Sequence, residues 1–146
     1  MGDLAYWPAA KPLSKKNTFA KNRDFIKNLD HIDQIWEKLK FKCGDTLAVC
    51  DLRGKYKEKF SYSELADLIT KVSFSFENYG LKKGDVVTVI SENSPRWLAV
   101  DQGLMRLGAI NAVRGINSPS VELDYIIGHS NSVGLIVQSK EIWLKL

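Results

Sequence analysis

Short apolar runs alternate with helical patterns from residue 86 onward, and this alternation limits the fold more than any other feature. Residues 86–90 (VVTVI) are almost continuously apolar, as expected of a strand buried on both faces of a parallel sheet. Strands are also predicted over residues 109–114 and 134–138, and helices begin at Pro95, at Ser118-Pro119 and at Ser139. Strand and helix therefore alternate three times, which predicts an α/β fold of mostly parallel strands with right-handed crossovers and helices on both faces.

The preceding stretch, residues 29–85, predicts a helix, a pair of strands and a second helix. Asp30 is placed to cap the first helix, which the turn at residues 43–45 ends. Two short strands follow, one over residues 46–51 and one that ends at Phe60, joined by a turn at Arg53-Gly54. The apolar residues of the first helix recur at helical spacing: Ile32, Ile35, Trp36 and Leu39.

The helix that begins after Ser61 has the clearest boundaries in the sequence. Ser61 and Glu64 have the spacing of a capping box, and Gly80 suits the left-handed residue that follows a helix end. Between them, apolar residues recur along one helical face: Leu65, Leu68, Ile69, Val72 and Phe76. The pattern predicts a well-defined amphipathic helix.

Polar and aromatic residues gather directly after the strand at residues 86–90, in the segment SENSPRW (residues 91–97). Ligands of α/β proteins usually bind at the carboxyl ends of strands, so this position suggests a site. We favour a structural interpretation, in which Asn93 or Ser94 caps the next helix, Pro95 begins it and Trp97 packs on the sheet. On that interpretation, Asn93→Ala is expected to lower stability rather than ligand affinity.

The glycines form neither of the common nucleotide-binding patterns. No G-x-G-x-x-G motif is present, because Gly80 and Gly84 are the closest pair. Gly103 and Gly108 have the spacing of a phosphate-binding loop, but Ala109 follows where that loop requires lysine. We interpret Gly103 and Gly108 as packing residues of a helix and its end.

The sequence contains no signature of a nucleophile or a metal site. G-x-S-x-G and H-E-x-x-H motifs are absent, and His31 and His129 have no neighbouring nucleophile or metal ligand. Cys43 and Cys50 lack C-x-x-C spacing, which argues against both a zinc site and a disulfide framework. We therefore assign no catalytic, cofactor-binding or metal-binding residue.

The net charge of +4 lies entirely in residues 1–28, which hold six cations and two anions. This basic leader suits a solvated arm, which we favour, or weak contact with an anionic lipid surface or a polyphosphate partner. Because the remainder is balanced in charge, a nucleic-acid partner is not expected. No apolar stretch reaches the length of a membrane span, and the free thiols suit a reducing compartment, so a cytoplasmic location is expected.

Several blocks of the sequence occur in the order and spacing of a known family. They are FSYSEL (residues 60–65), GLKKGDVVTVISENSPRW (residues 80–97) and DQGLMRLGAINAVR (residues 101–114), followed by ELDYIIGHS and GLIVQ. The chain thus resembles the opening of the adenylate-forming (AMP-binding) enzymes, which include acyl-CoA synthetases, luciferases and the adenylation domains of peptide synthetases. SENSPRW together with AVDQG and NAVRG is similar, more narrowly, to long-chain acyl-CoA or acyl-acyl-carrier-protein synthetases of cyanobacteria and plastids.

The resemblance implies an ATP-dependent ligase that converts a long-chain fatty acid to an acyl-adenylate and then to a thioester of CoA or acyl carrier protein. In the family, the phosphate loop, the magnesium-binding acid and the catalytic lysine lie downstream of the matched blocks. No catalytic role is therefore carried over, and we expect an N-terminal fragment that is inactive alone and depends on a complementary C-terminal fragment. The alternative is a non-catalytic binding module for an acyl carrier protein or a partner synthetase subunit, with contacts from Lys15, Lys16 and Lys21.

The resemblance also implies an incomplete part of a two-sheet fold. By this analogy, residues 29–85 contribute to a first sheet, and residues 86–146 form a βαβαβ unit of a second sheet. A partial fold of this kind is expected to leave apolar helix faces and strand edges exposed, with poor solubility or dependence on a partner.

Overall fold

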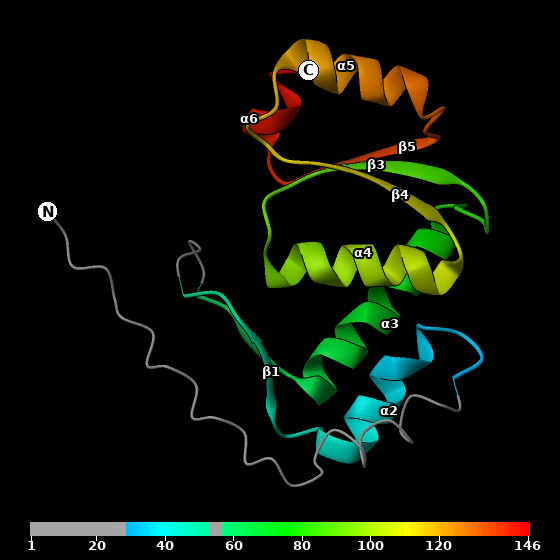
Figure 1. Cartoon of the computed structure of the whole chain (residues 1–146), viewed down its shortest axis with the longest axis vertical. Helices are drawn as coiled ribbons and strands as arrows, with labels where there is room; N and C mark the ends of the chain where they lie inside the picture. Colours follow the sequence, from blue (N-terminus) through cyan, green and yellow to red (C-terminus); the bar gives the residue numbers. More distant parts are fainter. Residues whose placement is uncertain (1–28, 53–56) are drawn as a thin grey trace, which may run out of the picture. The chain divides into compact units, whose positions relative to one another are not determined.

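The computed structural model describes residues 29–52 and 57–146, and these contain every element of Figure 1. Residues 31–146 form one compact unit, and this unit carries the fold. The predicted leader at residues 1–28 and the predicted turn at Arg53-Gly54 lie outside the described residues. The elements are α2 (Gln34–Cys43), β1 (Leu47–Cys50), β2 (Lys59–Ser61), α3 (Tyr62–Asn78), β3 (Val86–Ile90), α4 (Pro95–Leu107), β4 (Ile110–Arg114), α5 (Ser120–His129), β5 (Gly134–Val137) and α6 (Lys140–Trp143).

The first helix begins later than predicted. Asp33, not Asp30, occupies the N-cap position of α2, and its side chain makes no capping hydrogen bond. The residues before it form a turn, in which the Gln34 amide donates to the His31 carbonyl at 3.2 Å. The prediction that Asp30 caps the helix was therefore wrong, because this turn satisfies the first amide groups in place of a carboxylate. The predicted end of the helix is confirmed, since α2 stops at Cys43.

The strands β1 and β2 pair antiparallel and lead directly into α3. The predicted capping box is confirmed: the Glu64 amide donates to Ser61 Oγ at 3.2 Å, and the Ser61 amide donates to Glu64 Oε2 at 2.8 Å. The helix then buries one apolar face, with Leu65 and Ile69 each only 1% exposed. Gly80 follows the helix with a φ of +90°, which confirms its left-handed conformation.

The strands β3, β4 and β5 form a separate parallel sheet in the order β4-β3-β5. The central strand β3 alternates its side chains, so that Val87 and Val89 pack with α4, while Ile90 packs with α5 and α6. Figure 1 shows α4 on one face of this sheet and α5 and α6 on the other. The predicted α/β fold with helices on both faces is therefore confirmed. The two crossovers move in opposite directions across the sheet on opposite faces, so they have the same handedness.

The helix α4 joins the parallel sheet to the elements that precede it. Its inner side packs on β3 through Leu104, and its outer side packs on α3 through Ala99, both 0% exposed. Trp36 of α2 donates its indole hydrogen to Gln102 of α4 at 2.8 Å, and Arg96 of α4 contacts Glu58 before β2 at 2.7 Å. The earlier elements are thus attached to the sheet by one shared helix.

The two glycines at phosphate-loop spacing have the packing roles that the sequence predicted. Gly103 is buried in α4, where a Cβ atom would lie 2.8 Å from Val72 Cγ1 of α3. Gly108 ends α4 with a φ of +77°, and the Ala109 amide after it bonds back to the Leu104 carbonyl. Close helix approach and a left-handed end therefore explain their spacing.

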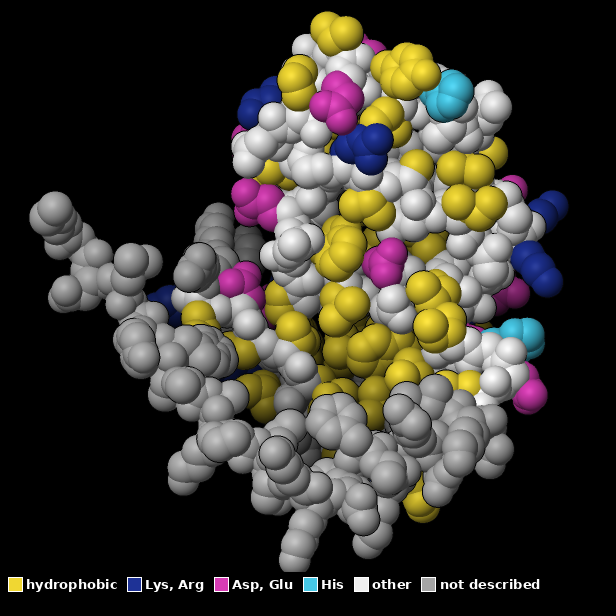
Figure 2. Space-filling model, in the orientation of Figure 1, with side chains coloured by type: hydrophobic (Ala, Val, Ile, Leu, Met, Phe, Trp, Pro, Cys, Tyr) yellow, Lys and Arg dark blue, Asp and Glu magenta, His cyan; other side chains and the backbone are white. Residues whose placement is uncertain are grey.

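Large apolar side chains remain exposed on the unit formed by residues 31–146, as predicted. The exposed fraction is 96% for Phe41 of α2 and 78% for Val121 of α5. In Figure 2, apolar side chains are visible on the surface at the end formed by α5 and α6. Among the described strands, β4 and β5 each pair on one side only. No helix in the described part of the chain has the length and apolar character that crossing a membrane requires.

The close contact at Gly103 generates a stability prediction with a matched control. Gly103→Ala places a methyl group against Val72 and the Ser73 amide, at 2.8 and 3.3 Å, and should lower the free energy of unfolding by about 1–3 kcal/mol. In Gly128→Ala of α5, the added Cβ atom has no neighbour within 4 Å. This substitution should instead raise the free energy of unfolding by a few tenths of a kcal/mol, up to about 1 kcal/mol. Urea unfolding followed by circular dichroism measures both. Equal effects of the two substitutions would contradict the tight packing of α3 and α4.

A second prediction concerns a buried group of hydroxyls between β3 and the α5–β5 loop. Thr88 is 0% exposed, and its Oγ1 lies 2.7 Å from Ser132 Oγ, which lies 2.7 Å from Ser130 Oγ. Thr88→Val keeps the shape but removes a hydrogen-bond partner, so it should cost about 1–2 kcal/mol of stability. Thr46→Val, at an exposed position, should change stability by less than about 0.5 kcal/mol in the same denaturation assay.

Candidate functional site

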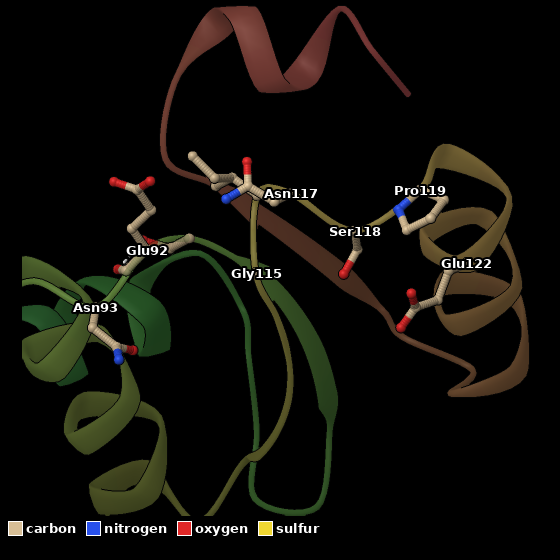
Figure 3. Close-up of a pocket in the computed structure, with 9 residues that line it drawn as sticks. Glu92, Asn93, Gly115, Asn117, Ser118, Pro119 and Glu122 are labelled. Carbon is tan, nitrogen blue, oxygen red and sulfur yellow. Dashed lines mark hydrogen bonds between the residues drawn. The ribbon is translucent and has the colours of Figure 1, made fainter.

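A cleft of about 530 Å³ opens at the carboxyl edge of the parallel sheet. Two loops form its walls: the β3–α4 loop on one side, and the β4–α5 loop with the first turn of α5 on the other (Figure 3). Its position follows from the topology, because β3 continues to a helix on one face and β4 to a helix on the other. The lining residues are Ser91, Glu92, Asn93, Gly115, Ile116, Asn117, Ser118, Pro119 and Glu122.

The first wall is held to the sheet through its backbone. The Ser91 amide donates to the Arg114 carbonyl at 3.1 Å, and the Glu92 amide donates to Gln138 Oε1 at 2.7 Å. Ser91 Oγ donates to the Glu92 carbonyl at 2.9 Å and also lies 3.2 Å from Gln138 Oε1. The Glu92 and Asn93 side chains are exposed and make no hydrogen bond or ion pair with a described residue. A fixed backbone therefore presents two free polar side chains at the cleft.

The second wall carries one paired carboxylate. Glu122 Oε1 lies 3.2 Å from Nε of Arg114, whose Nη1 also donates to the Val113 carbonyl at 2.8 Å. In Figure 3, Ser118 and Glu122 project from this wall, opposite Asn93 at the start of α4. The two partners are each almost half exposed, so the ion pair orients Glu122 more than it stabilises the fold.

The helix start on this wall differs in detail from the prediction that Ser118-Pro119 opens the helix. The helix α5 begins at Ser120, Pro119 occupies its N-cap position, and no side chain caps its first turn. The Glu122 and Leu123 amides instead bond to the Pro119 carbonyl, at 3.0 and 3.1 Å. The Ser118 hydroxyl is consequently not used for capping.

The SENSPRW segment has both a structural and a cleft-lining part. Ser94 is the cap, because its Oγ accepts a hydrogen bond from the Trp97 amide at 3.0 Å, and Pro95 is buried at the first helical position. Trp97 packs with Val87 and Val89, as predicted. Asn93 takes no part in capping, so the stability loss expected for Asn93→Ala has no structural basis. Ser91, Glu92 and Asn93 line the cleft instead.

The histidines and cysteines of the sequence lie outside the cleft lining. His31 precedes α2, and His129 ends α5 with its ring stacked on Tyr125 at 5.1 Å between centroids. Cys43 and Cys50 are free thiols in α2 and β1, and the Cys43 thiol donates to the Leu39 carbonyl at 3.3 Å. Across residues 29–52 and 57–146, no group of three or more His, Cys, Asp or Glu is placed to hold a metal ion.

The β4–α5 loop and Glu122 were missed in the sequence. The sequence does indicate this loop, because residues 115–119 (GINSP) directly follow the strand β4, just as residues 91–94 directly follow β3. Carboxyl ends of neighbouring parallel strands lie at one edge, so both loops belong to one cleft. The lining combines two carboxylates with amides and hydroxyls and includes no lysine, histidine or cysteine. The cleft lining therefore lacks the general base and the reactive thiol or amine that activated nucleophiles commonly use.

Comparison with known proteins places the chain in a family. Residues 36–145 match the family described as AMP-binding enzyme. The chain is 35% identical over 115 residues to the probable acyl-activating enzyme 16, chloroplastic, of Arabidopsis thaliana. It is 33% identical over 115 residues to the long-chain-fatty-acid–[acyl-carrier-protein] ligase AEE15, chloroplastic, of the same plant. Each alignment covers 79% of this chain but only 16% of the relative. The chain belongs to the AMP-binding enzyme family.

Solved structures agree with this assignment. The N-terminal subdomain of Klebsiella oxytoca NpsA superposes with a TM-score of 0.67 at 25% identity, over 77% of this chain and 28% of that one. The N-terminal domain of FACL13 from Mycobacterium tuberculosis gives a TM-score of 0.71 at 18% identity, over 79% of this chain and 29% of that one, which supports the fold alone. The chain therefore has the fold of a part of the N-terminal subdomain of adenylate-forming enzymes. It spans about a sixth of the length of its plant relatives.

The division of roles within SENSPRW gives a paired prediction. Ser94→Ala removes the cap of α4 and should lower the free energy of unfolding by about 1 kcal/mol. Asn93→Ala, one residue earlier, should leave stability within about 0.5 kcal/mol of the starting value, because its side chain bonds to no described residue. Thermal and urea denaturation of the two variants in parallel distinguish them. A larger loss of stability in Asn93→Ala than in Ser94→Ala would indicate that Asn93, and not Ser94, caps α4.

Proposed function

We propose that this chain is the N-terminal part of an ATP-dependent ligase that activates long-chain fatty acids. The acid is converted to an acyl-adenylate and then to a thioester of CoA or acyl carrier protein. The observation that carries the proposal is the family match over residues 36–145, together with 33% identity to a plant ligase named for long-chain fatty acids and acyl carrier protein. The SENSPRW, AVDQG and NAVRG blocks favour the cyanobacterial and plastid branch of the family.

The role proposed for this chain is structural rather than catalytic. The cleft does not fit the phosphates of ATP, because no lysine lines it and its only charged lining groups are the carboxylates of Glu92 and Glu122. The residues of the cleft therefore have no catalytic part in the proposed reaction. The elements before Val86 contribute to one sheet and those after it to another, and the ATP site and the thiol-acceptor site are formed by other parts of the ligase.

The proposal is tested by ATP–pyrophosphate exchange with a long-chain fatty acid such as palmitate. The chain alone should give no exchange. The chain mixed with a polypeptide equivalent to the remaining part of the plant relatives should give palmitate-dependent exchange, and omission of either component should abolish it. Size-exclusion chromatography of the mixture establishes whether the two polypeptides associate.

Three outcomes would count against the proposal. Exchange by the chain alone would show that its residues form an ATP site. A stable complex without exchange would argue against a ligase role. Salt-sensitive association with an acidic acyl carrier protein, without exchange in any mixture, would favour the binding module in which Lys15, Lys16 and Lys21 form the contacts.

A further inference from the structure

We draw no further inference here: the strongest candidate, the exposed apolar patch that Val121 and Tyr125 form with the stacked ring of His129 on α5, carries none, because nothing in the structure shows what covers it.

Discussion

The close contact between α3 and α4 is the interaction on which the rest of the structure depends. Gly103 brings the backbone of α4 against Val72 and the Ser73 amide of α3, closer than any other residue type allows. The hairpin β1–β2 and the helix α2 pack on α3, while β3 packs on the opposite side of α4. Two small groups of elements, neither with a large core of its own, therefore share α4 as a common wall.

The position of α4 also decides where the cleft lies. Ser94 and Pro95 begin the helix directly after β3, so the chain turns sharply and leaves Ser91 to Asn93 at the edge of the sheet. The β4–α5 loop turns toward the opposite face, and the two loops separate. The cleft between them is lined by two carboxylates and by no lysine, histidine or cysteine.

Much of the fold could be predicted from the sequence because the signals were local. The capping box at Ser61, the left-handed glycines and the apolar run of β3 each depend on neighbouring residues. The predictions failed where two local signals competed. Asp30 is a residue type that often caps helices, but a turn lies between it and α2. Asn93 and Ser94 are both suitable caps by residue type, and only the position of the helix start shows that Ser94 is the cap. The candidate site was only half predicted, because its second wall comes from a loop about 20 residues later in the chain.

The sequence by itself determined the α/β class, the order of its strands and helices and the family resemblance, since each follows from periodicity, caps and motif order along the chain. The tertiary structure alone decided that Gly103 is a contact between helices, that β3 is the central strand and that two distant loops form one cleft. The physical reason is that pockets and close contacts join residues far apart in the chain, and only packing against the shared helix α4 and the parallel sheet fixes which of them meet.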